Sequence, residues 1–311
     1  MSRRARWARA SLAQAVLVAV GCAVAGPGHA GALRHCDPPT PISAHQQDRL
    51  LRFAAIIKTE LDASGRRLAL MSRSGLDLAR FGQRYSHTGV SLKASGNTPW
   101  SVRQLYYACD EGRPKIFDQG ISGFLVGSDD PSLGYISVVL LPPASGDPLE
   151  QAALDDRLAL RLLGTRYSAN AHAFSDTYQN CNQWVAELLA LAWGPDIAAA
   201  TDRNPRGQAQ RWLKVQGYEP TVFDVGNRAL MWLGNLIPWL HADDHPAEDL
   251  DRALYRVSMP ASIEAFVQAA VPGAERLEFC HHGPRVVLRR GWAPIAAGCE
   301  PGAQDQVTWL D

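Results

Sequence analysis

The sequence predicts an α+β protein built around a central antiparallel sheet. Residues 47–64 carry apolar side chains at helical spacing, which is typical of a helix packed on a core. Residues 84–93 alternate apolar and polar side chains, and a short turn links them to a second strand at 100–109, so we expect a hairpin. Residues 134–143 are rich in β-branched side chains, which indicates a buried strand.

Further elements follow from the same patterns. We expect a strand at 67–75, helices at 148–165, 181–194, 209–218 and 262–271, and a hairpin near the C-terminus. No internal repeat or low-complexity tract is present. We divide the chain into a signal peptide at 1–30, a core at 31–200, and a C-terminal α+β extension at 201–311 that packs on the core.

The N-terminus has the features of an export signal. Four arginines precede a short apolar run, and the small residues of "GHAGA" predict cleavage after Ala30. The apolar run is too short to span a membrane, so we expect a periplasmic or secreted protein with no transmembrane helix in its mature form. The alternative is a lipoprotein anchored at Cys22.

Composition narrows the class of partner. The 311 residues are 46% hydrophobic and 20% charged, as in globular proteins, and 31 basic side chains balance 31 acidic ones. Nucleic-acid binding needs a basic surface, so the zero net charge argues against a nucleic-acid partner.

Removal of the signal leaves five cysteines, an odd number. In an oxidising compartment, two disulfides and one free thiol are the simplest arrangement. Cys280 and Cys299 flank a strand and its return and form a natural local pair, and Cys36 can pair with Cys109. Cys181 is then the free thiol.

Cys181 opens a predicted helix. Asn180 is a good N-cap residue, and Gln183 three positions later completes a capping-box pattern. Unpaired N–H groups and the helix dipole at this position favour a thiolate, which is the nucleophilic form of cysteine. The alternative is a small buried residue, because Cys181 also begins an apolar stripe along the helix.

A thiol nucleophile needs a base, and His87 is the best candidate. It lies on the more polar face of the strand at 84–93, although a satisfied sheet histidine has the same pattern. Gln104 on the next strand is the side chain best suited to orient the imidazole, with Tyr106 and Tyr107 as alternatives.

The order of these motifs resembles that of the circularly permuted NlpC/P60-like hydrolases. "SHTGV" lies on a strand, a partner strand follows, and "NCNQWVAELL" opens a helix much later. The resemblance covers residues 65–195 and implies a papain-like fold with Cys181 as nucleophile, His87 as base and Gln104 as orienting residue. More narrowly, "YSHTGVSL", "IFDQGI", "YQNCNQWVAELL" and "SMPASIEAFV" are similar to a bacterial envelope family of unknown function numbered 2145.

These features predict an exported cysteine hydrolase that acts on an amide or ester bond in a cell-wall peptide or an acyl lipid, without a cofactor. The alternative function is a non-catalytic envelope binding protein on the same scaffold. A third class is a metal-dependent protein that uses the cluster His241, Asp243, Asp244 and His245. We favour a helix cap for that cluster, with Asp244 or His245 before a helix that has Pro246 at its first position.

Overall fold

The computed structural model describes residues 36, 42–126, 130–195, 197 and 204–310. The predicted signal peptide and Cys22 lie outside these residues. Residue contacts divide the chain into two units, Met1–Pro38 and Pro39–Asp311, and all described helices and strands belong to the second unit.

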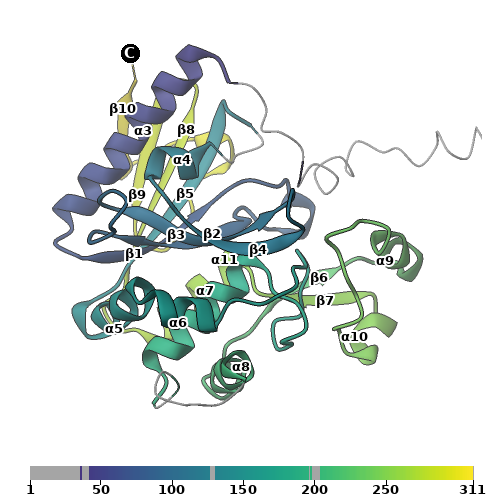
Figure 1. Cartoon of the computed structure of the whole chain (residues 1–311). Coiled ribbons are helices and arrows are strands. Elements are labelled where there is room, and N and C mark those ends of the chain that lie inside the picture. Colours follow the sequence, from purple (N-terminus) through teal and green to yellow (C-terminus); the bar gives the residue numbers. More distant parts are fainter. Residues whose placement is uncertain (1–35, 37–41, 127–129, 196, 198–203, 311) are drawn as a thin grey trace, which may run out of the picture. The chain divides into compact units, whose positions relative to one another are not determined.

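Eight strands form one sheet in which every neighbouring pair is antiparallel (Figure 1). In spatial order they are β10 (Gln306–Trp309), β9 (Arg285–Arg290), β8 (Glu275–His282), β5 (Leu133–Leu140), β1 (Leu68–Arg73), β2 (His87–Leu92), β3 (Ser101–Ala108) and β4 (Arg113–Gln119). The α+β class and the central antiparallel sheet are thus confirmed. The C-terminal strands extend this same sheet, because β8 pairs with β5 along its whole length.

Helices cover both faces of the sheet (Figure 1). One face packs against α3 (Ala44–Ala63) and α4 (Ile121–Leu125). The other face packs against α5 (Pro143–Leu154), α6 (Asp156–Arg161), α7 (Cys181–Trp193), α8 (Pro205–Val215) and α11 (Pro260–Ala270). Side chains of a strand alternate between its two faces, so Leu70 joins the core under α7 and Met71 joins the core under α3.

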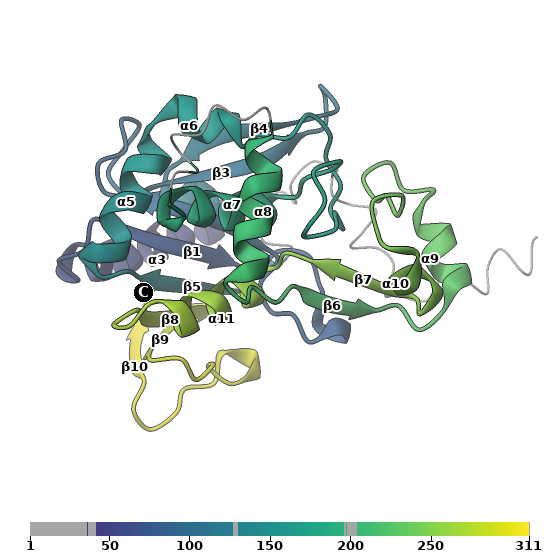
Figure 2. The ribbon, with the colours of Figure 1, turned by 90° about the horizontal axis from the view of Figure 1, so that it is seen from below.

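A second, two-stranded sheet lies beside the main one (Figure 2). It consists of β6 (Thr221–Asp224) and β7 (Leu254–Val257), and the chain between them forms α9 (Arg228–Gly234) and α10 (Ala247–Asp251). Trp232 on α9 is 64% exposed, and Leu236 in the turn after α9 is 70% exposed. None of the described helices is long and apolar enough to cross a membrane.

The predicted helix at 148–165 is in fact two helices. Asp155 is extended between α5 and α6, and its carboxylate accepts hydrogen bonds from the N–H groups of Arg157 and Leu158. An aspartate competes in this way with helix continuation. Strand β4 was not expected, because its sequence "RPKIFDQ" contains a proline and three charges. It lies at the edge of the sheet, where both are tolerated.

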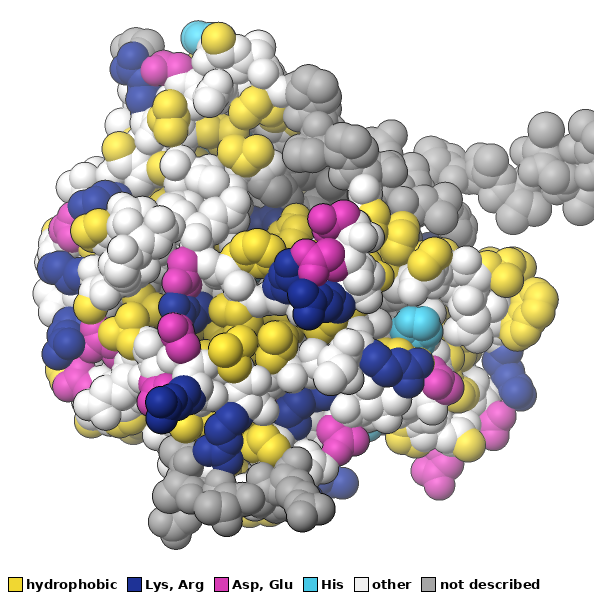
Figure 3. Space-filling model, viewed as in Figure 1, with side chains coloured by type: hydrophobic (Ala, Val, Ile, Leu, Met, Phe, Trp, Pro, Cys, Tyr) yellow, Lys and Arg dark blue, Asp and Glu magenta, His cyan; other side chains and the backbone are white. Residues whose placement is uncertain are grey.

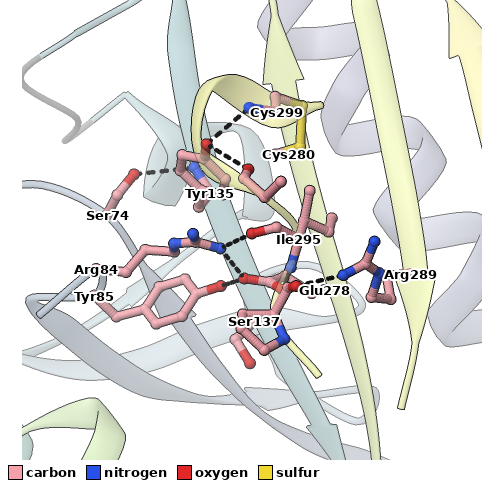
Figure 4. A network of polar contacts seen from close by, with 12 residues as sticks. Ser74, Arg84, Tyr85, Tyr135, Ser137, Glu278, Cys280, Arg289, Ile295 and Cys299 are labelled. Atoms are coloured by element: carbon pink, nitrogen blue, oxygen red, sulfur yellow. Dashed lines mark hydrogen bonds and ion pairs between the residues drawn. A yellow bond between two sulfur atoms is a disulfide. The ribbon is translucent and has the colours of Figure 1, made fainter. Parts of the chain in front are cut away.

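The cysteines divide as the odd count predicts. Cys280 and Cys299 form a disulfide, and Cys36 and Cys109 are both disulfide-bonded as well. Cys181 is free and buried. The turn that carries Cys299, η2 (Ala297–Cys299), is held further by Tyr135, whose hydroxyl accepts the N–H of Cys299, and a polar network around Glu278 lies beside it (Figure 4).

That network surrounds a fully buried carboxylate. Glu278 on β8 accepts hydrogen bonds from Arg84, from the hydroxyl of Tyr85 and from the N–H of Ile295 (Figure 4). The opposing charges and hydrogen bonds satisfy the carboxylate within the protein interior. The segment that leads into β2 and the C-terminal loop are therefore fastened to the same strand.

Candidate functional site

Cys181 is the first residue of α7. The side chain of Asn180 accepts a hydrogen bond from the N–H of Gln183 at 2.7 Å, which confirms the predicted N-cap. The second half of the expected capping box is wrong. The Gln183 amide instead donates to the carbonyls of His172, Ala173 and Ser175 in the preceding loop. The cap residue holds the helix start, and Gln183 holds the loop that leads to it.

Burial of the Cys181 thiol acts against its ionisation. Only 8% of the residue is exposed, and burial raises its pKa to about 12. The charge of Arg73 and the N–H groups of Asn182, Cys181 and Thr88 act in the opposite direction and are outweighed. The helix start therefore provides the stabilising groups that its sequence predicts, while burial keeps the sulfur neutral at pH 7.

His87 is the first residue of β2 and is 7% exposed. Its Nε2 lies 2.5 Å from the Oε1 of Gln104. A carbonyl oxygen only accepts, so Nε2 of His87 donates the proton in this hydrogen bond. The Nε2 of Gln104 donates in turn to Oε1 of Gln119 at 2.7 Å. Two amide side chains in a row thus orient the imidazole through its Nε2.

Of the three residues considered as partners of His87, Gln104 makes the hydrogen bond. The ring of Tyr106 lies edge-on to the imidazole with a centroid distance of 6.1 Å. Tyr107 stacks on Tyr167 with ring centroids 4.8 Å apart and packs against the core on the α7 side of the sheet. Successive residues of β3 face opposite ways, so Tyr107 cannot share the face of Gln104.

Strand β2 approaches α7 through the backbone on either side of His87. The N–H of Thr88 donates to Oδ1 of Asn182 at 2.9 Å, and Nδ2 of Asn182 donates to the carbonyl of Ser86 at 3.2 Å. Asn182 directly follows Cys181 in the chain. The first turn of α7 and the start of β2 are therefore joined by one side chain.

The two faces of β2 divide the site. Val90 packs in the core under α7 together with Cys181. By the two-residue alternation of a strand, His87 shares the opposite face with Gly89, and its ring lies 5.9 Å from that of Phe124 on α4. The imidazole and the thiol therefore belong to adjacent elements at the start of β2, with the backbone of residues 86–88 between the two layers.

Gly89 is required by the close approach of β2 and β3. A Cβ at this position would lie 2.4 Å from Cγ1 of Val102 and 3.2 Å from Cβ of Gln104. Atoms at 2.4 Å overlap, so only glycine fits here. The side chain of Gln104 can therefore extend alongside β2 and reach the ring of His87.

The cluster between α9 and α10 does not form a metal site. The ring of His241 stacks on Tyr178 at 4.4 Å, and Asp243 accepts a hydrogen bond from the hydroxyl of the same tyrosine. Nε2 of His245 bonds the carbonyl of Asn170 at 2.8 Å. Among the described residues, no group of three or more His, Cys, Asp or Glu side chains could hold a metal ion.

The prediction that Asp244 or His245 caps the helix after this cluster is also wrong. Pro246 itself is the N-cap of α10, without a side-chain hydrogen bond, and the helix begins at Ala247. Asp244 instead accepts the N–H of His172 at 2.9 Å. Its carboxylate thus fastens the segment before α10 to the loop before α7, a tertiary partner that local sequence does not reveal.

Sequence reasoning missed three residues of the site. Gln119 lies on the unexpected strand β4, and Asn182 is hidden inside the predicted helix. Arg73 ends the strand β1, which is apolar except for Ser72, and an arginine within a predicted buried strand was a usable signal. The pairing of β3 with β4 is needed to place Gln119, and the contact of α7 with β2 is needed to place Asn182.

The fold and site define an α+β protein whose described residues include one free thiol, at a helix start, and a histidine held by amide side chains on the neighbouring strands. A family model described as "Uncharacterized protein conserved in bacteria (DUF2145)" matches residues 60–267, and the chain belongs to this family. No curated protein and no solved structure matches the chain.

Proposed function

We propose that the protein is an exported cysteine hydrolase with a papain-like, circularly permuted NlpC/P60-type arrangement. The single observation that carries the proposal is the chain His87–Gln104–Gln119, which orients the imidazole of His87 through its Nε2. An amide that orients the imidazole of the base is the arrangement of the third member of a catalytic triad. Cys181, the free cysteine of the described residues, opens the helix that contacts this strand.

In the proposed reaction, Nδ1 of His87 takes the proton of the Cys181 thiol through one water molecule at the start of β2, because the backbone of residues 86–88 lies between the two side chains. The sulfur then attacks the carbonyl carbon of an amide or ester, a carbon–sulfur bond forms, and the π electrons move to the carbonyl oxygen. The N–H groups at the start of α7 stabilise that oxyanion. His87 gives its proton to the departing amine or alkoxide as the bond to the leaving group breaks. Water, deprotonated by His87, then attacks the thioester, releases the acid and returns the thiol.

A local opening of the native protein, which substrate binding would favour, has to expose the sulfur. The pKa of about 12 belongs to a buried thiol, and an imidazolium beside the sulfur would favour the thiolate. Tyr167 is close enough to Cys181 for a thiolate to raise the pKa of its hydroxyl further, although burial is the larger cause.

The proposed substrate is a cell-wall peptide or an acyl lipid. Beside His87, two aromatic rings are available for an extended apolar or peptide group: Tyr106 is 43% exposed and Phe117 is 44% exposed. They meet edge to face with centroids 6.2 Å apart. Hydrophobic side chains gather next to basic and acidic ones over β4 (Figure 3). Disulfides and the signal-like N-terminus support a location in the periplasm or outside the cell.

Alkylation of the native protein by iodoacetamide tests the mechanism without a known substrate. Cys181 should react at neutral pH, and His87→Ala should slow its alkylation about tenfold to hundredfold, because the base is lost. Cys181→Ala is the control for labelling elsewhere. Equal rates for the wild type and His87→Ala would contradict the Cys–His pair. Cys181→Ala should also abolish turnover once a substrate is found.

A non-catalytic envelope binding protein is the second candidate. The burial of Cys181 favours it, because a thiol with a pKa of about 12 is almost entirely un-ionised at neutral pH. In that case Cys181 labels only after denaturation, and its rate follows the rate of unfolding. Comparison of the labelling rate with the unfolding rate, measured by tryptophan fluorescence, separates the two functions.

A further inference from the structure

Asn182 spans the histidine of the proposed site in an unusual way. Its amide accepts the N–H of Thr88 at 2.9 Å and donates to the carbonyl of Ser86 at 3.2 Å, so it holds the backbone on both sides of His87. The same Nδ2 lies 3.8 Å from the sulfur of Met259, just before α11. Asn182 itself is 2% exposed. Its contacts with Thr88 and Met259 are buried, and its contact with Ser86 is partly buried.

The sheet explains why these backbone groups need a side chain. The register between β2 and β3 covers Val90–Leu92, so Thr88 lies beyond that ladder. A buried N–H or carbonyl without a partner costs about 1–3 kcal/mol. Asn182 takes the place of a strand neighbour, because a carboxamide carries a donor and an acceptor on one short side chain. Aspartate and serine lack that combination at the same reach.

The two hydrogen bonds of Asn182 to the backbone of Ser86 and Thr88, which we call the clamp, hold the start of β2 against α7. They thereby control the distance between the imidazole of His87 and the thiol of Cys181. Cys181 and Asn182 are consecutive, and His87 lies between the two backbone groups that Asn182 binds. The N–H of Thr88 also acts to lower the pKa of the Cys181 thiol. A shift of β2 relative to α7 would therefore move the imidazole and this donor together, away from the thiol.

We infer that Asn182 is a positioning residue, which sets the start of β2 against the start of α7 so that His87 and Cys181 act as a pair. This inference rests on the proposed function. It assigns to Asn182 no contact with the substrate. Its role is to hold a geometry in which a displacement of about 1 Å can cost a hundredfold in rate.

Two readouts test this role separately from the proposed function. The first is the pH dependence of Cys181 alkylation by iodoacetamide. Asn182→Ala should slow alkylation at pH 7 about tenfold or more and move its midpoint toward that of His87→Ala. The double variant His87→Ala/Asn182→Ala should match His87→Ala alone, since Asn182 acts through His87. Additive effects, or an unchanged midpoint in Asn182→Ala, would overturn the inference.

The second readout is the titration of the His87 imidazole, followed by NMR. If the two groups are paired, Cys181→Ala shifts this titration in the wild type, and the same change has no effect in the Asn182→Ala background. An equal shift in both backgrounds, or none in either, overturns the inference. A shift that depends on Asn182 without any native alkylation of Cys181 instead supports the clamp and defeats only the proposed hydrolase.

Gln183→Ala is the matched control. Gln183 is in the same helical turn and is fully buried, but its amide binds carbonyls of residues 172, 173 and 175 and none of β2. It should lower stability without moving the alkylation midpoint. Asn182→Asp keeps an acceptor for Thr88 and should restore part of the rate if the clamp positions His87. A shift of the midpoint in Gln183→Ala as large as in Asn182→Ala would reduce Asn182 to a general packing role.

Discussion

The ion pair between Glu187 and Arg206 provides the sharpest test of how the loop before Cys181 is held. Glu187 on α7 is fully buried, and Arg206 on α8 is 8% exposed at its side chain. Nε of Arg206 lies 2.9 Å from the carboxylate, and its other nitrogens donate to the carbonyls of Asp176 and Tyr178, each at 2.8 Å. One guanidinium thus connects two helices and the loop "DTYQN".

Arg206→Met leaves the carboxylate buried without its cation. Loss of one partner of a buried pair costs about 3–5 kcal/mol, and we expect the free energy of unfolding to fall by this amount. The hydrogen bonds that Gln179 and Gln210 donate to Glu187, at 2.6 and 2.7 Å, remain in the variant. Because they still stabilise the carboxylate, we expect a loss of stability toward the lower end of this range. Chemical denaturation followed by tryptophan fluorescence measures the change. A loss below about 1 kcal/mol would refute the reasoning.

The pKa of Glu187 determines how the destabilisation by Arg206→Met changes with pH. Burial raises the pKa of Glu187 above its usual value, and the charge of Arg206 opposes the rise. A carboxyl with a raised pKa binds more protons when folded, so its contribution to stability is present below the unfolded pKa and is lost as pH rises through the folded pKa. Removal of Arg206 raises the folded pKa further. The deficit of Arg206→Met should therefore be largest at neutral pH and shrink on acidification.

Two controls accompany this variant. Arg228→Met breaks an exposed ion pair with Asp251, whose side chains are 69% and 66% exposed, and should cost less than about 1 kcal/mol. Glu187→Gln/Arg206→Met removes both charges while it keeps an oxygen for the neighbouring amides. It should recover part of the stability that Arg206→Met loses. No recovery would mean that the loop carbonyls, rather than the charge, account for the loss.

Two further predictions concern the sheet. Gly89→Ala should lower the free energy of unfolding by about 1–3 kcal/mol, because its Cβ would lie 2.4 Å from Val102. Gly96→Ala is the control, since a Cβ there has nothing within 4 Å, and its free energy of unfolding should be near that of the wild type in the same denaturation assay. Equal effects would contradict the close approach of β2 and β3. Replacement of Cys280 and Cys299 by alanine should cost about 3 kcal/mol, because their disulfide closes a loop with a sequence separation of 19. A double variant as stable as the wild type would show that the disulfide does not stabilise the C-terminal loop.

Local chemistry explains the features that were predictable. Helix α3, the pairing of β2 with β3 and the cap at Asn180 depend on spacing and on hydrogen bonds within a few residues, so the chain specifies them at short range. The odd cysteine count likewise singled out Cys181, whose free state is confirmed. The roles of Cys181 and His87 in a reaction stay predictions.

Other features depend on side-chain hydrogen bonds that periodicity does not reveal or on contacts that are distant in sequence. Asp155 divides an expected helix, because its carboxylate finds two N–H groups that a periodicity count does not consider. Strand β4 forms through a partner, since "RPKIFDQ" has little strand preference and becomes ordered by its long pairing with β3. Gln119 therefore enters the site only through that pairing.

By itself, the sequence determined a capped helix that begins at Cys181, a histidine on a strand and a single unpaired thiol. These follow from backbone geometry and from counting, which act locally. Only the tertiary structure decided that Gln104 holds His87, that Asn182 joins β2 to α7, and that the thiol is buried. Burial and register arise from the packing of segments almost a hundred residues apart, and they set the protonation state that local sequence cannot.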